Sequence, residues 1–130
     1  MRIGLALMGA VATLVAATSG LAAQKASAAE KCFDVSEVKG HTIADDHTLY
    51  LKVGGASIYR LGMSNNCLGG MGPGDPVTVK ARSASKICEA ADLDVHAEVN
   101  GGGLSSRCIL DTLTKLTPAQ ASAIPAKLKP

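Results

Sequence analysis

Aromatic residues are the scarcest class in this sequence, which has one Phe, two Tyr and no Trp among 130 residues. Proteins that bind single-stranded nucleic acid stack the bases on aromatic side chains, so this composition argues against that class. The chain also lacks an excess of positive charge. Its first 28 residues hold Arg2, Lys25 and no acid, which leaves 11 basic and 11 acidic residues in the remainder. We therefore expect no nucleic-acid partner.

The chain is also too short for a multidomain enzyme, since 130 residues correspond to a single domain. With 47% hydrophobic and 18% charged residues it is too apolar for wholesale disorder. One folded domain is expected.

The N-terminus has the pattern of a secretory signal peptide. Arg2 supplies a positive start, residues 3–23 carry no charge, and Ala26-Ser27-Ala28 is a small-residue cleavage pattern. We expect cleavage after Ala28, or else after one of the alanines at 22 and 23. A retained membrane anchor is the alternative, because about 20 apolar residues can span a bilayer. The predicted product is a periplasmic or secreted monomer with no remaining membrane span.

Four cysteines follow this segment, Cys32, Cys67, Cys88 and Cys108. An even number in a short exported chain indicates disulfides. Zinc is the rival interpretation, but the sequence has no C-x-x-C pair of the kind that structural zinc sites use. Of the three possible connectivities we predict Cys32–Cys108, which would join the ends of the domain, and Cys67–Cys88, which would close a local hairpin region.

Alternating apolar residues predict an all-β fold. The clearest pair is residues 48–53 and 58–63 around a Gly-rich turn, which is typical of a β-hairpin. Asp45-Asp46 is expected to form a turn before it. Further strands are expected over 76–82, 93–99 and 107–113, with a second hairpin turn at 100–103. The predicted architecture is a small barrel or sandwich of five to six antiparallel strands with two disulfides.

A short C-terminal helix is predicted to begin at Thr117. Thr117 is a suitable N-cap, Pro118 suits the first helical position, and Gln120 can complete a capping box. The helix should end near Ile124. The predicted organisation is a signal peptide over 1–28, a disulfide-stabilised β domain over 29–125 and a flexible tail over 126–130.

The order of these landmarks resembles a family of small exported proteobacterial domains of unknown function with four cysteines. The residues that carry the resemblance are Cys32-Phe33, Val38-Lys39-Gly40, residues 44–49, Ile58-Tyr59-Arg60-Leu61, Cys67-Leu68, Ile87-Cys88, Arg107-Cys108 and Leu116-Thr117-Pro118-Ala119. The resemblance spans about residues 32–124. It implies export and a cysteine framework, and it supplies no activity or catalytic residue. Family members often have an aromatic residue after the second cysteine, where this chain has Gly69-Gly70-Met71-Gly72.

One cluster has the residue types of a metal site. His41, Asp45, Asp46 and His47 lie within seven residues and offer imidazole and carboxylate ligands. Turn formation and ordinary solvent exposure explain the same residues, so we expect no metal and no cofactor, with these four as weak candidates.

Two other motifs are incomplete. His96-Ala97-Glu98 matches half of the zinc-deaminase signature, but the P-C-x-x-C half is missing, so a solvated strand face is expected. The glycine-rich stretch 69–74 lacks the Gly-Lys-Ser/Thr ending of a phosphate loop and contains Pro73, which has no backbone donor.

Tyr50, Lys52 and Arg60 are predicted to share the outer face of the first hairpin. Tyr and Arg are favoured anchors in protein interfaces, although an ordinary polar sheet face is the simpler interpretation. We therefore expect a non-catalytic binding or interaction module that takes an unknown protein or small ligand. A secreted enzyme inhibitor and a metal-binding envelope protein are the alternatives.

Overall fold

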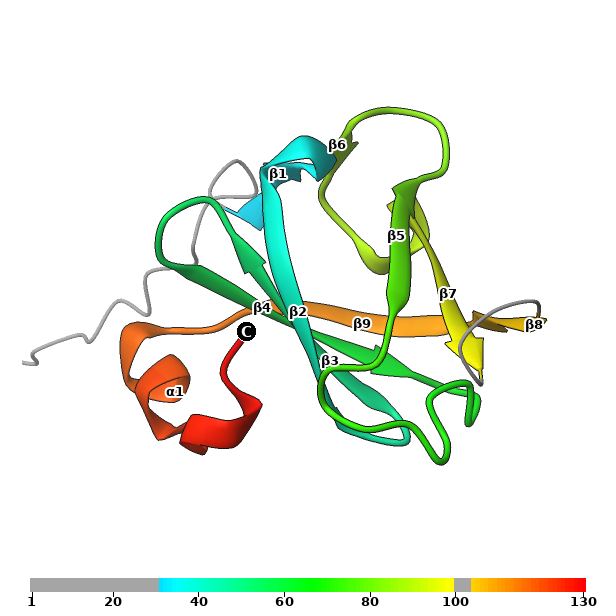
Figure 1. Ribbon diagram of the computed structural model, residues 1–130. Helices are drawn as coiled ribbons and strands as arrows, with labels where there is room; N and C mark the ends of the chain where they lie inside the picture. The colour runs from blue at the N-terminus through cyan, green and yellow to red at the C-terminus, as the bar shows by residue number, and fades with distance from the viewer. Residues whose placement is uncertain (1–30, 100–103) are drawn as a thin grey trace, which may run out of the picture.

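The computed structural model describes residues 31–99 and 104–130, in which the chain forms three antiparallel sheets and one short α-helix (Figure 1). The predicted signal peptide and the predicted turn at 100–103 lie outside the described residues. The strands are β1 (Phe33–Asp34), β2 (Val38–Asp45), β3 (Thr48–Val53), β4 (Ser57–Met63), β5 (Val77–Ala81), β6 (Lys86–Ile87), β7 (Leu93–Val99), β8 (Leu104–Cys108) and β9 (Leu110–Lys115). The all-β prediction is confirmed.

The largest sheet has the order β2-β3-β4-β9. Its centre is the predicted hairpin, in which Leu49 pairs with Leu61 and Leu51 with Tyr59. These four side chains are at most 2% exposed, because alternate residues of each strand point to the same face. Gly54 has a φ of +61° in the connecting turn, a conformation that residues with a Cβ rarely adopt.

The second sheet has the order β5-β7-β8, and its β8 runs almost directly into β9 of the first. One bent stretch of chain therefore serves both sheets. Leu93, Val95 and Ala97 on β7 are fully buried and join the same core cluster as the hairpin residues. The two sheets therefore share one core.

The free edge of β2 faces the segment that leads into β5. The backbone N–H of Ile43 donates to the Pro73 carbonyl at 3.0 Å. Two residues earlier, His41 Nε2–H donates to the Asp75 carbonyl at 3.0 Å. At this seam, where β2 meets residues 73–75, the His41 side chain makes the hydrogen bond that a backbone N–H would make in a continuous β-ladder. The result is a barrel that is closed only in part on this side.

The third sheet consists of β1 and β6 alone, with Phe33 opposite Ile87. This pairing brings Cys32 beside Cys88, and they form a disulfide with their Cα atoms 4.2 Å apart. The Phe33 ring packs on the Tyr59 ring at a centroid distance of 4.6 Å, which attaches the small sheet to the barrel.

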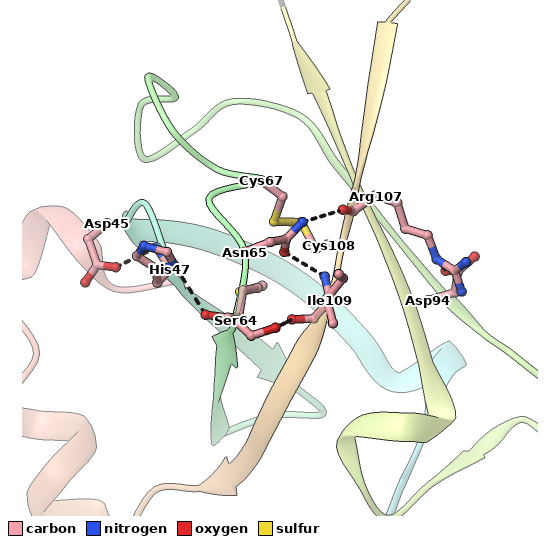
Figure 2. The surroundings of a disulfide bond; sticks show 10 residues. Asp45, His47, Ser64, Asn65, Cys67, Asp94, Arg107, Cys108 and Ile109 are labelled. Atoms are coloured by element: carbon pink, nitrogen blue, oxygen red, sulfur yellow. Dashed lines mark hydrogen bonds and ion pairs between the residues drawn. A yellow bond between two sulfur atoms is a disulfide. The ribbon is translucent and has the colours of Figure 1, made fainter.

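The second disulfide joins Cys67 to Cys108 and lies in the core, where the two residues are 4% and 0% exposed. Figure 2 shows how Asn65 connects the same two segments. Its Nδ2 donates to the Arg107 carbonyl at 2.9 Å, and its Oδ1 accepts the Ile109 N–H at 2.8 Å. The amide thereby replaces a neighbouring strand at the junction of β8 and β9.

The predicted connectivity, Cys32–Cys108 and Cys67–Cys88, is therefore wrong. The prediction assumed that the segment from 67 to 88 is a local hairpin. In the structure, β5 lies within that segment and pairs with β7 in the second sheet, which separates the two cysteines. Cys108 lies at the β8–β9 junction near the end of β4, rather than beside the N-terminal strand.

The strand predictions were incomplete in other places. β2 was missed because its ladder with β3 has irregular register near Val38 and again near Asp45, which hides the alternation. The single strand predicted over 107–113 is two strands that belong to different sheets, β8 and β9. The turn predicted at Asp45-Asp46 is present between β2 and β3.

The C-terminal helix α1 (Pro118–Ala123) is confirmed together with its capping box. Thr117 Oγ1 accepts the Gln120 N–H, and Gln120 Oε1 accepts the Thr117 N–H. A 3₁₀ turn, η4 (Ala126–Leu128), follows and contacts β2, so part of the segment predicted as a flexible tail is folded back on the sheet. Within residues 31–99 and 104–130, no helix has the length and apolar character needed to cross a membrane.

The two disulfides should differ in how readily they are reduced. Cys88 is exposed and Cys32 is half-buried, whereas the other pair is buried. Because thiol–disulfide exchange requires access to a sulfur, a dithiol reductant added to the folded protein should open Cys32–Cys88 faster than Cys67–Cys108, by roughly tenfold or more. Timed alkylation followed by peptide mass spectrometry measures both rates. Equal rates, or faster opening of Cys67–Cys108, would contradict the assigned burial.

Candidate functional site

The four residues proposed as weak metal ligands are dispersed over different parts of one hairpin. His41 lies in the middle of β2 and bonds to the Asp75 carbonyl. Asp45 ends that strand, and its Oδ1 accepts the backbone N–H of His47 at 2.9 Å. The His47 ring points toward the end of β4, where its Nδ1–H donates to the Met63 carbonyl at 3.2 Å (Figure 2).

These contacts give three of the four residues structural partners in the turn and at the seam. In the part of the chain that the structure describes, no three His, Cys, Asp or Glu residues are grouped as metal ligands would be. The hypothesis that His41, Asp45, Asp46 and His47 form one site is therefore not supported by their positions, because β2 is extended and places His41 well away from the turn.

His96 and Glu98 lie on the outer face of the second sheet, as predicted for a solvated strand face. Both are half-buried, while their neighbours Val95 and Ala97 point into the core. Glu98 Oε1 accepts the Thr78 hydroxyl at 3.1 Å, and His96 Nε2–H donates to Asp94 at 3.1 Å.

Asp94 is the centre of this face. Its other carboxylate oxygen accepts Arg107 Nε–H at 3.2 Å, and its side chain is 28% exposed. Burial raises the pKa of Asp94, but the hydrogen bond from His96 and the positive charges of His96, Arg107 and Arg82 outweigh burial and leave the pKa below its ordinary value. Asp94 is therefore ionised at neutral pH and holds its neighbours in place.

The arrangement does not form a nucleophile. A hollow of about 320 Å³ lies over this face and includes Ser105. Among the described residues, no hydroxyl is hydrogen-bonded to the His96 ring, which bonds to Asp94. A serine nucleophile needs a bonded base, and His96 is bonded to Asp94 rather than to Ser105.

The glycine-rich stretch 69–74 is a structured loop. The Asp75 carboxylate accepts the Gly72 N–H at 2.7 Å, and the Asp75 N–H donates to the Gly72 carbonyl at 3.2 Å. A phosphate loop directs its backbone N–H groups at the ligand. Here the Asp75 carboxylate already accepts one of these N–H groups, that of Gly72. This agrees with the expectation from the sequence that the stretch lacks the features of a phosphate loop.

The outer face of the first sheet carries the predicted interaction residues. Tyr50 lies directly opposite Arg60, with Thr42 and Thr114 as the next residues of the same row across the four strands. Arg60 is exposed, and it forms no ion pair within residues 31–99 and 104–130. Lys52 lies opposite Ile58 in the adjacent row and is half-buried.

The C-terminal segment covers the β2 end of the row that contains Thr42, Tyr50 and Arg60. Thr42 is only 6% exposed although it points away from the core, and η4 contacts the strand that carries it. Figure 1 shows α1 and the C-terminal turn on the side of β2 away from β5. A hollow of about 390 Å³ remains between α1 and the turn that joins β3 to β4. Sequence reasoning missed this hollow because it depends on how the chain folds back after β9.

The ionised state of Asp94 should be visible in the pH dependence of stability. Because its pKa is lowered in the folded state, the ionised carboxylate stabilises the fold above the ordinary Asp pKa of 3.8, and this contribution is lost as the pH falls through the folded-state pKa. Urea unfolding between about pH 7 and about pH 3 should therefore show a smaller loss of stability for Asp94→Asn than for the unmodified protein.

Asp46→Asn is the matched control, because Asp46 lies exposed in the β2–β3 turn. It should follow the unmodified protein over the whole pH range. If Asp94→Asn and Asp46→Asn gave the same curve, the network around Asp94 would not stabilise the fold.

Comparison with known proteins provides no relative from which a function can be transferred. No family model, no curated protein and no solved structure matches the chain. The resemblance to exported four-cysteine domains therefore remains a prediction, and the function is argued from the geometry.

Proposed function

We propose that this chain is a periplasmic or secreted, non-catalytic interaction domain that binds another protein through the outer face of its four-stranded sheet. Export is supported by the two disulfides, which use all four cysteines and are typical of oxidising compartments. The N-terminal pattern of the sequence agrees with export.

The observation that carries the binding role is the pair formed by Tyr50 and Arg60. The two residues are directly opposite on neighbouring strands, so their side chains lie side by side on a rigid surface. A rigid sheet lowers the entropy that an anchor loses on binding. The exposed Arg60 guanidinium has no carboxylate partner among the described residues, which leaves its five donors for a ligand.

The proposal includes the case in which the bound protein is an enzyme that loses activity. A secreted inhibitor and a neutral interaction domain have the same surface requirements, and fold alone does not separate them. The identity of the bound partner separates the two. A metal-binding envelope protein is the less favoured alternative, since its proposed ligands do not converge.

Site-specific photo-crosslinking in the producing cell tests the proposal. A photoreactive amino acid at Thr114, which is exposed and lies opposite Arg60, should crosslink a specific protein in the envelope or secreted fraction. Arg60→Glu should reduce this product by about tenfold, because the anchor charge is reversed. The same photoreactive group at Ser105, exposed on β8 of the other sheet, is the control and should not produce this crosslink.

The proposal fails if the chain is found in the cytoplasm with reduced cysteines. It also fails if Thr114 and Ser105 crosslink the same proteins, or if Arg60→Glu has no effect. Loss of the activity of a crosslinked enzyme would identify the domain as an inhibitor.

A further inference from the structure

The hollow beside α1 has an apolar floor. The apolar residues that line it are Ala56, Ile58, Leu116, Pro118 and Ala121, with Ser57 and Lys115 beside them, and it holds about 390 Å³. That volume lies within the range of small-ligand sites and suits one large apolar side chain with its neighbouring backbone. The Leu116 N–H donates to the Ile58 carbonyl at 2.9 Å, which fixes the start of the C-terminal segment against β4. The floor is therefore built where the start of β4 meets the segment from the end of β9 to α1.

Two cations stand next to this floor. Lys52 lies directly across the ladder from Ile58, and Arg60 lies two residues further along β4 on the same face. Neither forms an ion pair within the described residues. Lys52 and Arg60 do not line the hollow itself, but both are neighbours of Ile58, which does. Two residues along a strand correspond to about 7 Å, which is the distance along β4 from Ile58 to Arg60.

The surrounding sequence contains no acid to neutralise them. Residues 47–74 and 112–130 carry Lys52, Arg60, Lys115, Lys127 and Lys129 but no Asp or Glu. These stretches form most of the four-stranded sheet and all of the C-terminal segment. Other acids belong to the same sheet, namely Asp45 at the end of β2 and Asp111 in β9, and five more are at Asp75, Glu89, Asp92, Asp94 and Glu98. The region without acids is therefore local, and it comprises β3, β4 and the C-terminal segment around the hollow.

We propose that the hollow beside α1 binds a short acidic segment of the partner protein, with one apolar side chain of that segment in the hollow and two carboxylates at Lys52 and Arg60. This inference rests on the proposed function and names the chemistry of the partner.

The spacing of the cations favours a peptide over a small amphiphile. Lys52 and Arg60 are diagonal neighbours on adjacent strands, which corresponds to about 7–8 Å. In an extended peptide, side chains two residues apart point the same way and lie about 7 Å apart, so two such carboxylates can reach both cations. A fatty acid has a single carboxylate and would satisfy only one of them.

Binding of a defined peptide to the exported, oxidised protein tests the inference. The probe is a blocked six-residue peptide that contains the run Leu-Ser-Glu-Ser-Glu, in which the leucine and both glutamates point to the same face of an extended chain. The control peptide has glutamines in place of both glutamates. Two-dimensional ¹H–¹⁵N NMR titration should show saturable shifts at residues 52–60 and 115–121 with the acidic peptide. The control peptide should bind about tenfold more weakly, and the difference should shrink as salt is added.

Two kinds of variant separate the parts of the site. Lys52→Glu with Arg60→Glu should weaken the acidic peptide by about tenfold or more, whereas Lys80→Glu with Arg107→Glu, on the other sheet, should leave its affinity unchanged. Ala121→Leu should fill the hollow and block the leucine without any change of charge. Retained disulfides and dispersed NMR spectra establish that each variant is folded.

The inference is overturned if the two peptides bind equally, if the shifts map to the second sheet, or if no shift occurs at millimolar peptide. It is also overturned if decanoate binds the hollow as tightly as the acidic peptide, which would assign the site to a small amphiphile. Crosslinking at Thr114 without peptide binding would leave the proposed function standing and remove this inference. Peptide binding without a cellular crosslink would do the reverse.

Discussion

The fold depends on the two disulfides that join distant parts of a short chain. Cys32–Cys88 and Cys67–Cys108 close loops of 56 and 41 residues, and loop-closure entropy assigns about 4 kcal/mol to each when considered alone. A domain of about 100 residues has a modest core, so contributions of this size are a large part of its net stability. The two bonds differ in role. The buried bond fixes the region where the two main sheets meet, and the exposed bond joins the two strands of the small third sheet, β1 and β6.

This framework determines which surfaces are available. The Cys67–Cys108 bond and the Asn65 side chain hold the junction of β8 and β9, so the two sheets diverge there with a fixed geometry. The charged groups around Asp94 on the second sheet form ion pairs with one another, whereas Lys52 and Arg60 on the first sheet form none among the described residues. This difference is the physical basis for placing the binding role on the first sheet.

Local features could be predicted from the sequence, and long-range ones could not. The hairpin of β3 and β4, the strand β7 and the capping box at Thr117 depend on periodicity and on contacts within a few residues, and all three are present. The cysteine pairing depends on which segments meet across the barrel, and it was mispredicted because β5 moves to the second sheet. β2 was missed because its register with β3 is irregular near Val38 and near Asp45, which breaks the alternating pattern. The hollow beside α1 arises only when the chain returns to the sheet after β9, which no local pattern reports.

The most direct test of this account is the denaturant-induced unfolding of the exported protein with its disulfides intact and after complete reduction. The account predicts a large fall in the unfolding midpoint, or loss of the folded state at room temperature, once both bonds are reduced. An unchanged midpoint would contradict it, because the core and the hydrogen-bonded sheets would then suffice without the crosslinks.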